Sequence, residues 1–239
     1  KFPRKGGAGP GGGRYEHWEP LCNDPDRAHV VASTICRLFD HSLPDEVRKA
    51  LLSAKLMGIP KASGPDPRVL GCGGVIRKMA TRAAARALLP EFREACGPHQ
   101  YGLQPDGSGR LHRALSAVAG TRKGAFICSV DLADAFTTVN RDAVIQACQA
   151  HCPSAIGIAE ALVGSSSSHV IQGTTSMEEA PQTVGLDQGC PLSPGLFSVA
   201  AKSPSQHAQT TMHTDDPKSL VLAFLDDTYL VGNGTAVAK

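Results

Sequence analysis

Three aspartates stand at the ends of apolar runs that have the length of β-strands. Asp131 ends the run AFICSV, and Asp226 and Asp227 separate SLVLAF from TYLVG. A carboxylate at the edge of a core must be paired or bind a metal, because desolvating it alone is very costly. Residues 124–239 hold 11 acidic but only four basic residues, so a divalent cation is the simplest partner. The alternative is a solvent-exposed Asp-Asp turn, a position that aspartate favours.

These carboxylates would make an all-oxygen site, which suits Mg²⁺, with Mn²⁺ as an alternative. Two such ions can activate a 3′-hydroxyl and stabilise a leaving pyrophosphate in an in-line displacement. The residues themselves are therefore compatible with phosphoryl transfer at a two-ion site.

The formal net charge of +2 hides a division between the two halves of the chain. Residues 1–123 carry 20 Lys and Arg against 11 Asp and Glu, so this half is basic and the other is acidic. This division indicates a polyanion bound by the first half and cations bound by the second. Lys78, Arg82 and Arg86 recur every four residues along one edge of a helix, which is either a solvated face or a phosphate contact.

Composition narrows the class of protein further. No run of 18 apolar residues occurs, so we expect no membrane span. The chain begins with Lys1 and has no signal-peptide pattern, which indicates a fragment. Eight scattered cysteines without a CxxC pair favour a reducing, intracellular compartment. Within the cell, the nucleus is a candidate location. A zinc set of His17, Cys22, His29 and Cys36 matches no common ligand spacing.

The elements that must hold these residues follow from Gly and Pro content and from apolar periodicity. The first 25 residues are rich in Gly and Pro and predict a mobile leader. Residues 57–74 should be loop or short extended segments, and 203–218 a polar loop. The order of the remaining elements predicts an α+β fold, an antiparallel sheet with helices on one face. The helices are expected over 27–39, 45–57, 75–89, 141–151, 154–163 and 191–202, and the strands over 125–132, 168–173, 219–224 and 228–232.

Three blocks, in this order, carry a resemblance to a known family: VDLADAF (130–136), GLDQGCPLSP (185–194) and AFLDDTYLV (223–231). The chain resembles the reverse transcriptases, most closely those of non-LTR (LINE-type) retrotransposons. Weaker matches are GIPKASGPDPRVLG (58–71), where Val69 replaces the family's usual Pro, and YGLQPDGSGRLHRAL (101–115).

The resemblance implies the fingers and palm of a right-hand polymerase. The fingers-like basic region would cover residues 26–124 and the palm 125–239, with part of 150–190 packed against the fingers. The thumb would be missing because the chain ends soon after the FLDD hairpin, and the isolated fragment is expected to be inactive. The implied partners are an RNA template, a DNA primer, dNTPs and other domains of the same polyprotein.

The resemblance also implies roles for individual residues. Asp131, Asp226 and Asp227 would be catalytic and hold the two metal ions. Phe136 would lie beneath the nucleotide sugar and exclude a 2′-hydroxyl, although its ring could also simply fill the core. Further nucleotide contacts would come from Lys61, Arg68, Leu132, Ala135, Gln188 and Gly189. Nucleic-acid contacts are expected from Lys78, Arg82 and Arg86 on the basis of the basic edge of their helix.

Two other functions remain open at this point. One is a decayed, non-catalytic retroelement remnant that at most binds nucleic acid. The other is the palm of an RNA-dependent RNA polymerase, which Phe136 disfavours because those enzymes usually carry a smaller or polar residue there.

Overall fold

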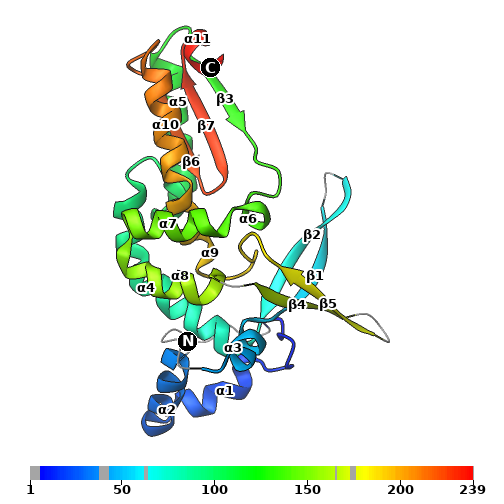
Figure 1. Ribbon diagram of the computed structural model, residues 1–239. Coiled ribbons are helices and arrows are strands. Elements are labelled where there is room, and N and C mark those ends of the chain that lie inside the picture. The colour runs from blue at the N-terminus through cyan, green and yellow to red at the C-terminus, as the bar shows by residue number, and fades with distance from the viewer. Residues whose placement is uncertain (1–5, 38–42, 62–63, 165, 173–175, 239) are drawn as a thin grey trace.

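The computed structural model describes residues 6–37, 43–61, 64–164, 166–172 and 176–238. It is elongated, with one sheet at the end that holds the C-terminus and helices of the N-terminal region at the other end, while a second sheet lies to one side of the helices between them (Figure 1). None of the helices within the described ranges is both long and apolar enough to cross a membrane. All eight cysteines lie in these ranges and are free thiols.

The palm sheet contains β3 (Phe126–Val130), β6 (Leu220–Phe224) and β7 (Asp227–Gly232), in the order β3-β7-β6. All pairs are antiparallel. Val130 pairs with Thr228 and Phe224 pairs with Asp227, so the end of β3 lies beside the hairpin turn. The antiparallel palm sheet predicted from the sequence is thus confirmed.

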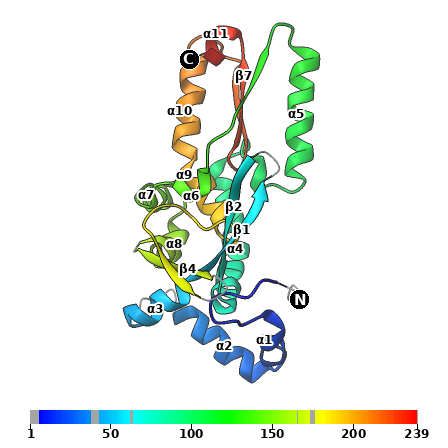
Figure 2. The same ribbon diagram turned by 90° about the vertical axis from the view of Figure 1, so that its right-hand side faces the viewer.

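Helices cover both faces of this sheet, which corrects the expectation of one covered face. Helix α5 (Gly107–Thr121) lies on one side, and α10 (Lys202–His213) with α11 (Gly234–Ala238) lies on the other (Figure 2). Leu222 packs with α5, whereas the next residue towards the N-terminus, Val221, packs with α10. A continuously apolar strand such as LVLAF is typical of burial on both faces.

Helix α10 also corrects the polar loop expected over 203–218. Its one proline, Pro204, lies in the first turn, where the missing N–H interrupts no helical hydrogen bond. Met212 is 2% exposed and packs against the palm sheet. Burial of this narrow apolar side holds an otherwise polar segment in a helix.

The second sheet, here called the fingers sheet, is built from two hairpins. Its order is β2-β1-β4-β5, with β1 and β4 parallel and the other pairs antiparallel. The strands are β1 (Ala54–Lys61), β2 (Gly64–Gly73), β4 (Ser167–Gln172) and β5 (Met177–Gln182). The Gly- and Pro-rich stretch at 57–74 therefore forms most of a long hairpin rather than loop, and the helix expected over 45–57 ends at Leu52 (α3, Asp45–Leu52).

Two short helices near the N-terminus correct the predicted leader over the described residues 6–25. Helix α1 (Tyr15–Cys22) and α2 (Pro25–Arg37) pack on α4 (Val75–Cys96) through a small core that includes Tyr15. Gly9 lies so close to the chain that a Cβ there would come within 2.5 Å of the backbone nitrogen of Gly74. The glycines here permit close packing, which composition alone cannot distinguish from flexibility.

The main core lies below the palm sheet and beside the fingers sheet in the view of Figure 1. It is formed mainly by α4, α7 (Arg141–His151), α8 (Ile156–Val163) and α9 (Ser193–Ala200), and Phe92, Val144 and Leu196 are almost fully buried in it. The short elements η1 (Tyr101–Leu103), α6 (Ala135–Thr138) and η2 (Pro153–Ala155) complete the chain.

Candidate active site

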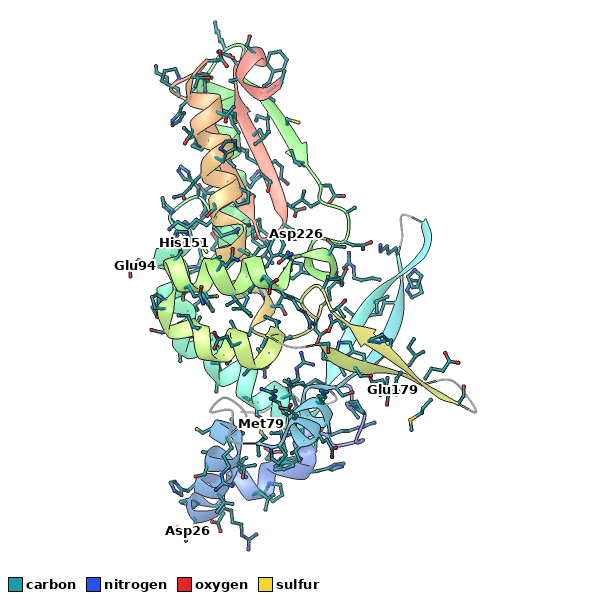
Figure 3. The ribbon with its side chains drawn as sticks, in the orientation of Figure 1. Asp26, Met79, Glu94, His151, Glu179 and Asp226 are labelled. Atoms are coloured by element: carbon teal, nitrogen blue, oxygen red, sulfur yellow. The ribbon has the colours of Figure 1, made fainter. Side chains whose placement is uncertain are left out.

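The palm sheet brings the three predicted catalytic aspartates to one end. Asp131 directly follows β3, Asp226 lies in the hairpin turn, and Asp227 begins β7. The pairing of Val130 with Thr228 places Asp131 beside Asp227 across neighbouring strands. Figure 3 shows Asp226 at the base of the hairpin, where the palm sheet meets the central helices.

The charges of these carboxylates act on one another. Partial desolvation raises the pKa of Asp227, and the neighbouring charges of Asp226 and Asp131 raise it further. No ion pair within the described ranges involves any of the three. An array of oxygen donors whose negative charges are not balanced by side chains has the chemistry of a Mg²⁺ site.

The side chains are nevertheless not gathered into a metal-ligand group. Among the described residues, no three His, Cys, Asp or Glu side chains have that arrangement, and this includes the zinc set considered from the sequence. Asp131 and Asp227 are exposed. Like charges favour separation, and exposed side chains can rotate towards a cation.

A cavity of about 380 Å³ joins residues from all three sequence blocks. Phe136, Gln188, Gly189 and Asp226 line it, together with Arg68 from the fingers hairpin. Its size is in the range of small-ligand sites. Five of the residues predicted to serve the nucleotide site therefore lie around one space.

Phe136 both lines this cavity and packs in the core. Its ring stacks on Phe197 of α9, with ring centroids 4.6 Å apart and an interplanar angle of 26°. The ring is half-buried, so one side contacts protein while another remains available to the cavity. Both roles that the sequence left open for Phe136 are compatible with this position.

Leu132 and Ala135 lie in the same loop but on a different cavity. They line an apolar space of about 590 Å³, which also reaches Asp226. Leu132 is 48% exposed, whereas Ala135 is buried at the start of α6. Their predicted contact with the triphosphate concerns the backbone and stays a prediction.

The fingers hairpin reaches the palm through its basic residues. Lys61 Nζ lies 3.6 Å from Asp134 Oδ1, and Asp134 belongs to the loop between Asp131 and Phe136. Arg68, on the facing strand, is exposed and lines the 380 Å³ cavity. These two cations are therefore placed beside the carboxylate end of the palm sheet.

The other three predicted basic residues lie elsewhere on the molecule. Lys78 Nζ donates to the carbonyl of Gly7, 2.6 Å away. Arg82 and Arg86 line a groove of about 290 Å³ between α4 and the helices α1 and α2. The structure does not bring them to the nucleotide cavity, and their contact with nucleic acid stays a prediction.

A buried charge cluster beside the cavity escaped the sequence reasoning. Arg77 Nη2 lies 2.5 Å from Asp187 Oδ2, and His169 Nε2 lies 2.7 Å from Asp187 Oδ1. Burial alone would raise the pKa of Asp187, but the His169 hydrogen bond and the charge of Arg77 outweigh it and hold that pKa well below its usual value. Two features of the sequence pointed to it: Arg77 lies off the basic edge of its helix, and Asp187 is a carboxylate within the block GLDQGCPLSP (185–194).

Known proteins give the family context for this geometry. The family model described as reverse transcriptase (RNA-dependent DNA polymerase) matches residues 59–239. Among curated protein sequences, the comparison found no match.

Solved structures with a similar fold include two fungal telomerases. The Candida albicans telomerase, in complex with a TWJ fragment of telomeric RNA, has a TM-score of 0.60 and 10% identity, over 82% of this chain and 40% of that chain. The apo telomerase of Candida tropicalis, truncated from the C-terminal domain, has a TM-score of 0.55 and 12% identity, over 79% of this chain and 45% of that chain.

At these identities the two structures show a shared fold, and the chain spans less than half of each. The family match itself covers the palm, most of the fingers sheet and every residue around the 380 Å³ cavity. By its sequence over residues 59–239, the chain belongs to the reverse transcriptase (RNA-dependent DNA polymerase) family.

Proposed function

We propose that this chain is the fingers and palm of an RNA-directed DNA polymerase that adds dNTPs to the 3′-hydroxyl of a primer. The observation that carries the proposal is the cavity where Arg68, Phe136, Gln188 and Gly189 meet Asp226. These residues come from segments far apart in the sequence, yet each was expected to serve the same nucleotide.

Asp131, Asp226 and Asp227 would hold two Mg²⁺ ions, or Mn²⁺ in their place. When bound, such ions supply positive charge for the developing negative charge of phosphoryl transfer. The three carboxylates alone would repel a triphosphate. Lys61 and Arg68 would provide attraction from the fingers side.

Selection of the nucleotide falls to the walls of the cavity. The Phe136 ring is held against Phe197, so it resists displacement by a sugar that carries a 2′-hydroxyl. Gly189 has a φ of +104°, a conformation that favours glycine, and it leaves the backbone accessible to a base or sugar. Gln188 is half-buried beside it and supplies an amide for hydrogen bonding.

This proposal includes the origin of the enzyme in a non-LTR retrotransposon, which is supported by the order and the residues of the three sequence blocks. It entails an intracellular, nuclear site of action and further domains in the same polyprotein. An RNA template and a DNA primer are the partners, and the basic charge of residues 1–123 favours their binding.

A non-catalytic, nucleic-acid-binding remnant is the second candidate. The observation in its favour is that the described carboxylates do not form a metal-ligand group. The two candidates differ in chemistry, and both are compatible with binding to nucleic acid, so assays of bond formation and of dNTP binding separate them.

The test is primer extension on an RNA template under single-turnover conditions, with protein in excess over primer–template. The isolated chain is expected to be inactive under ordinary assay conditions, because without a thumb it would hold the duplex weakly; excess protein removes this limit, because dissociation and rebinding no longer determine the product formed. We expect Mg²⁺-dependent addition of a matched dNTP, which Asp131→Ala abolishes. Asp142→Ala is the matched control, because Asp142 is an exposed aspartate in the first turn of α7.

RNA binding without either extension or Mg²⁺-dependent dNTP binding would establish the remnant and reject the polymerase. Extension that survives Asp131→Ala would reject the assigned carboxylates.

A further inference from the structure

A buried ionic cluster lies directly behind the nucleotide cavity. Asp187 is 7% exposed, Arg77 8% and His169 2%, and they come from the loop before α9, from α4 and from β4. Asp187 also lines the 380 Å³ cavity. The cluster therefore joins the fingers sheet, the central helices and the wall of the candidate active site.

Hydrogen bonds and an ion pair connect the members of this cluster to one another and to the backbone. The Ala54 backbone N–H donates to His169 Nδ1 at 3.3 Å, so Nδ1 carries no proton. Nε2 then carries a proton and donates to Asp187 Oδ1 at 2.7 Å. Arg77 also donates through its second terminal nitrogen, Nη1, to the carbonyl of Leu52 at 2.5 Å. Arg77 and Asp187 thus form an ion pair in a buried site, and the charge of the buried Arg141 acts on both.

Hydrogen bonds of the backbone around Asp187 connect the cluster to the wall of the cavity. The Asp187 carbonyl accepts from Ser193 Oγ at 2.9 Å and from the Cys190 N–H at 3.2 Å. The next carbonyl, that of Gln188, accepts from the Gly71 N–H of β2 at 3.0 Å. A Cβ on Gly71 would lie only 3.0 Å from Asp187 Cγ, so β2 and the loop are in close contact.

We infer that Asp187 is a positioning residue, which with Arg77 and His169 fixes Gln188 and Gly189 against the incoming nucleotide and ties the fingers sheet to the palm. The inference rests on the proposed function for its catalytic consequence. A buried ion pair gives little net stability compared with apolar packing, and one of its attested uses is to specify a single arrangement. Here the specified arrangement is that of the segment that lines the nucleotide cavity.

The first test measures this arrangement without any reaction. Asp187→Asn keeps the size of the side chain but removes its charge, so Arg77 remains buried beside a neutral amide. We expect amide hydrogen exchange at Gly71 and Cys190 to accelerate at least tenfold, because both N–H groups are held by the loop.

The matched control is Asp216→Asn, at a second buried aspartate that pairs with Arg122 at the end of the palm sheet opposite the Asp226 turn. Its effect should appear at the amides of Lys218 and Asn233, which donate to Asp216, while Gly71 and Cys190 exchange as in the wild type. Equal exchange at Gly71 and Cys190 in the wild type and in Asp187→Asn would overturn the inference.

A second pair of variants keeps the test decisive if Asp187→Asn does not fold. His169→Gln retains a side-chain donor and an acceptor, whereas His169→Leu retains neither. We expect loop protection to persist in the first and to fall in the second. Equal protection in both would contradict a positioning role for the hydrogen bond.

The catalytic readout is single-nucleotide incorporation. Gln188 and Gly189 would contact the nucleotide equally before and during the reaction, so their misplacement should act on binding rather than on the chemical step. For Asp187→Asn we expect the KM for dNTP to rise about tenfold with kcat within about threefold, and both constants unchanged in Asp216→Asn. A general loss of stability would change the two variants alike and would overturn the inference.

Absence of both extension and dNTP binding in the wild type would reject the proposed function. The exchange experiment would still decide whether Asp187 positions the loop.

Discussion

Replacement of Phe136 by Val separates sugar selection from core packing, because the ring takes part in both arrangements. Its stack on Phe197 would be lost, and the 380 Å³ cavity would widen on the side of Phe136. Phe197→Val is the matched control: it removes the same stack from the other ring, but Phe197 does not line that cavity.

The expected loss of stability follows from burial. A fully buried Phe→Ala change costs about 3–5 kcal/mol, and Val retains part of the apolar volume. Phe136 is only half-buried, so Phe136→Val should cost about 1–2 kcal/mol, of which the aromatic stack accounts for about 0.5–1.5 kcal/mol. For a domain of this size, that corresponds to a decrease in Tm of roughly 2–8 °C. Phe197 is 5% exposed, so its replacement should lower Tm more.

The expected change in selectivity is separate and has a different order among the variants. A steric clash with a 2′-hydroxyl is worth a few kcal/mol, so its removal should raise ribonucleotide use relative to deoxynucleotide use about 10- to 1,000-fold in kcat/KM. Phe197→Val should leave this ratio within about threefold of the wild type.

The assay is incorporation of a matched dNTP and rNTP by each variant, with thermal unfolding measured in parallel. An unchanged ratio in folded Phe136→Val would make the ring a core residue only and reopen the RNA polymerase interpretation. An equal rise in both variants would attribute selectivity to the stability of the stack rather than to the cavity wall.

Three further predictions concern charge and backbone. The pKa of Asp227 is raised by partial desolvation and by two neighbouring carboxylates, so the folded state loses stability as the pH rises from the ordinary carboxylate pKa through the raised one. Asp227→Asn should therefore raise Tm at neutral pH. Thermal unfolding should show that this gain vanishes below the ordinary carboxylate pKa. Gly185 has a φ of +77° and a Cβ there would lie 2.1 Å from a backbone carbonyl, so Gly185→Ala should destabilise by more than about 2 kcal/mol. By contrast, Gly157→Ala, in an open position on α8, should stabilise by about 0.5–1 kcal/mol in denaturant unfolding. If Arg82 and Arg86 contact phosphates, replacement of both by Gln should reduce the slope of log affinity against log salt by about 2 in RNA-binding titrations. An unchanged slope would mean that the two side chains line the groove beside α1 and α2 without contacting phosphates.

Much of the fold could be predicted wherever local sequence carries the signal. The palm strands and α7 were expected close to their observed bounds, because apolar runs of strand length and helical periodicity report directly on burial. The helix α10 was missed because its apolar side is narrow and its sequence polar. The hairpin of β1 and β2 was missed because its Gly and Pro residues resemble loop, although pairing with β4 adds stability that no local pattern contains.

The residue types for the chemistry were likewise readable from the sequence. Asp131, Asp226 and Asp227 ended apolar strands without basic partners, which pointed to a cation site. The structure placed them together through strand register, but it did not orient them as a ligand group among the described residues. Orientation of exposed like charges depends on what they bind, which neither periodicity nor spacing specifies.

By itself, the sequence determined which residues could perform the chemistry and the order in which the polymerase blocks occur. Only the tertiary structure decided which of them share a cavity and what supports it. Arg77 and Asp187 lie 110 residues apart, and their pairing exists only because α4 and the loop before α9 pack against the same sheet. Burial turns such distant charges into obligatory partners, since an isolated charge in the core is very costly, and a linear sequence does not reveal which positions will be buried together.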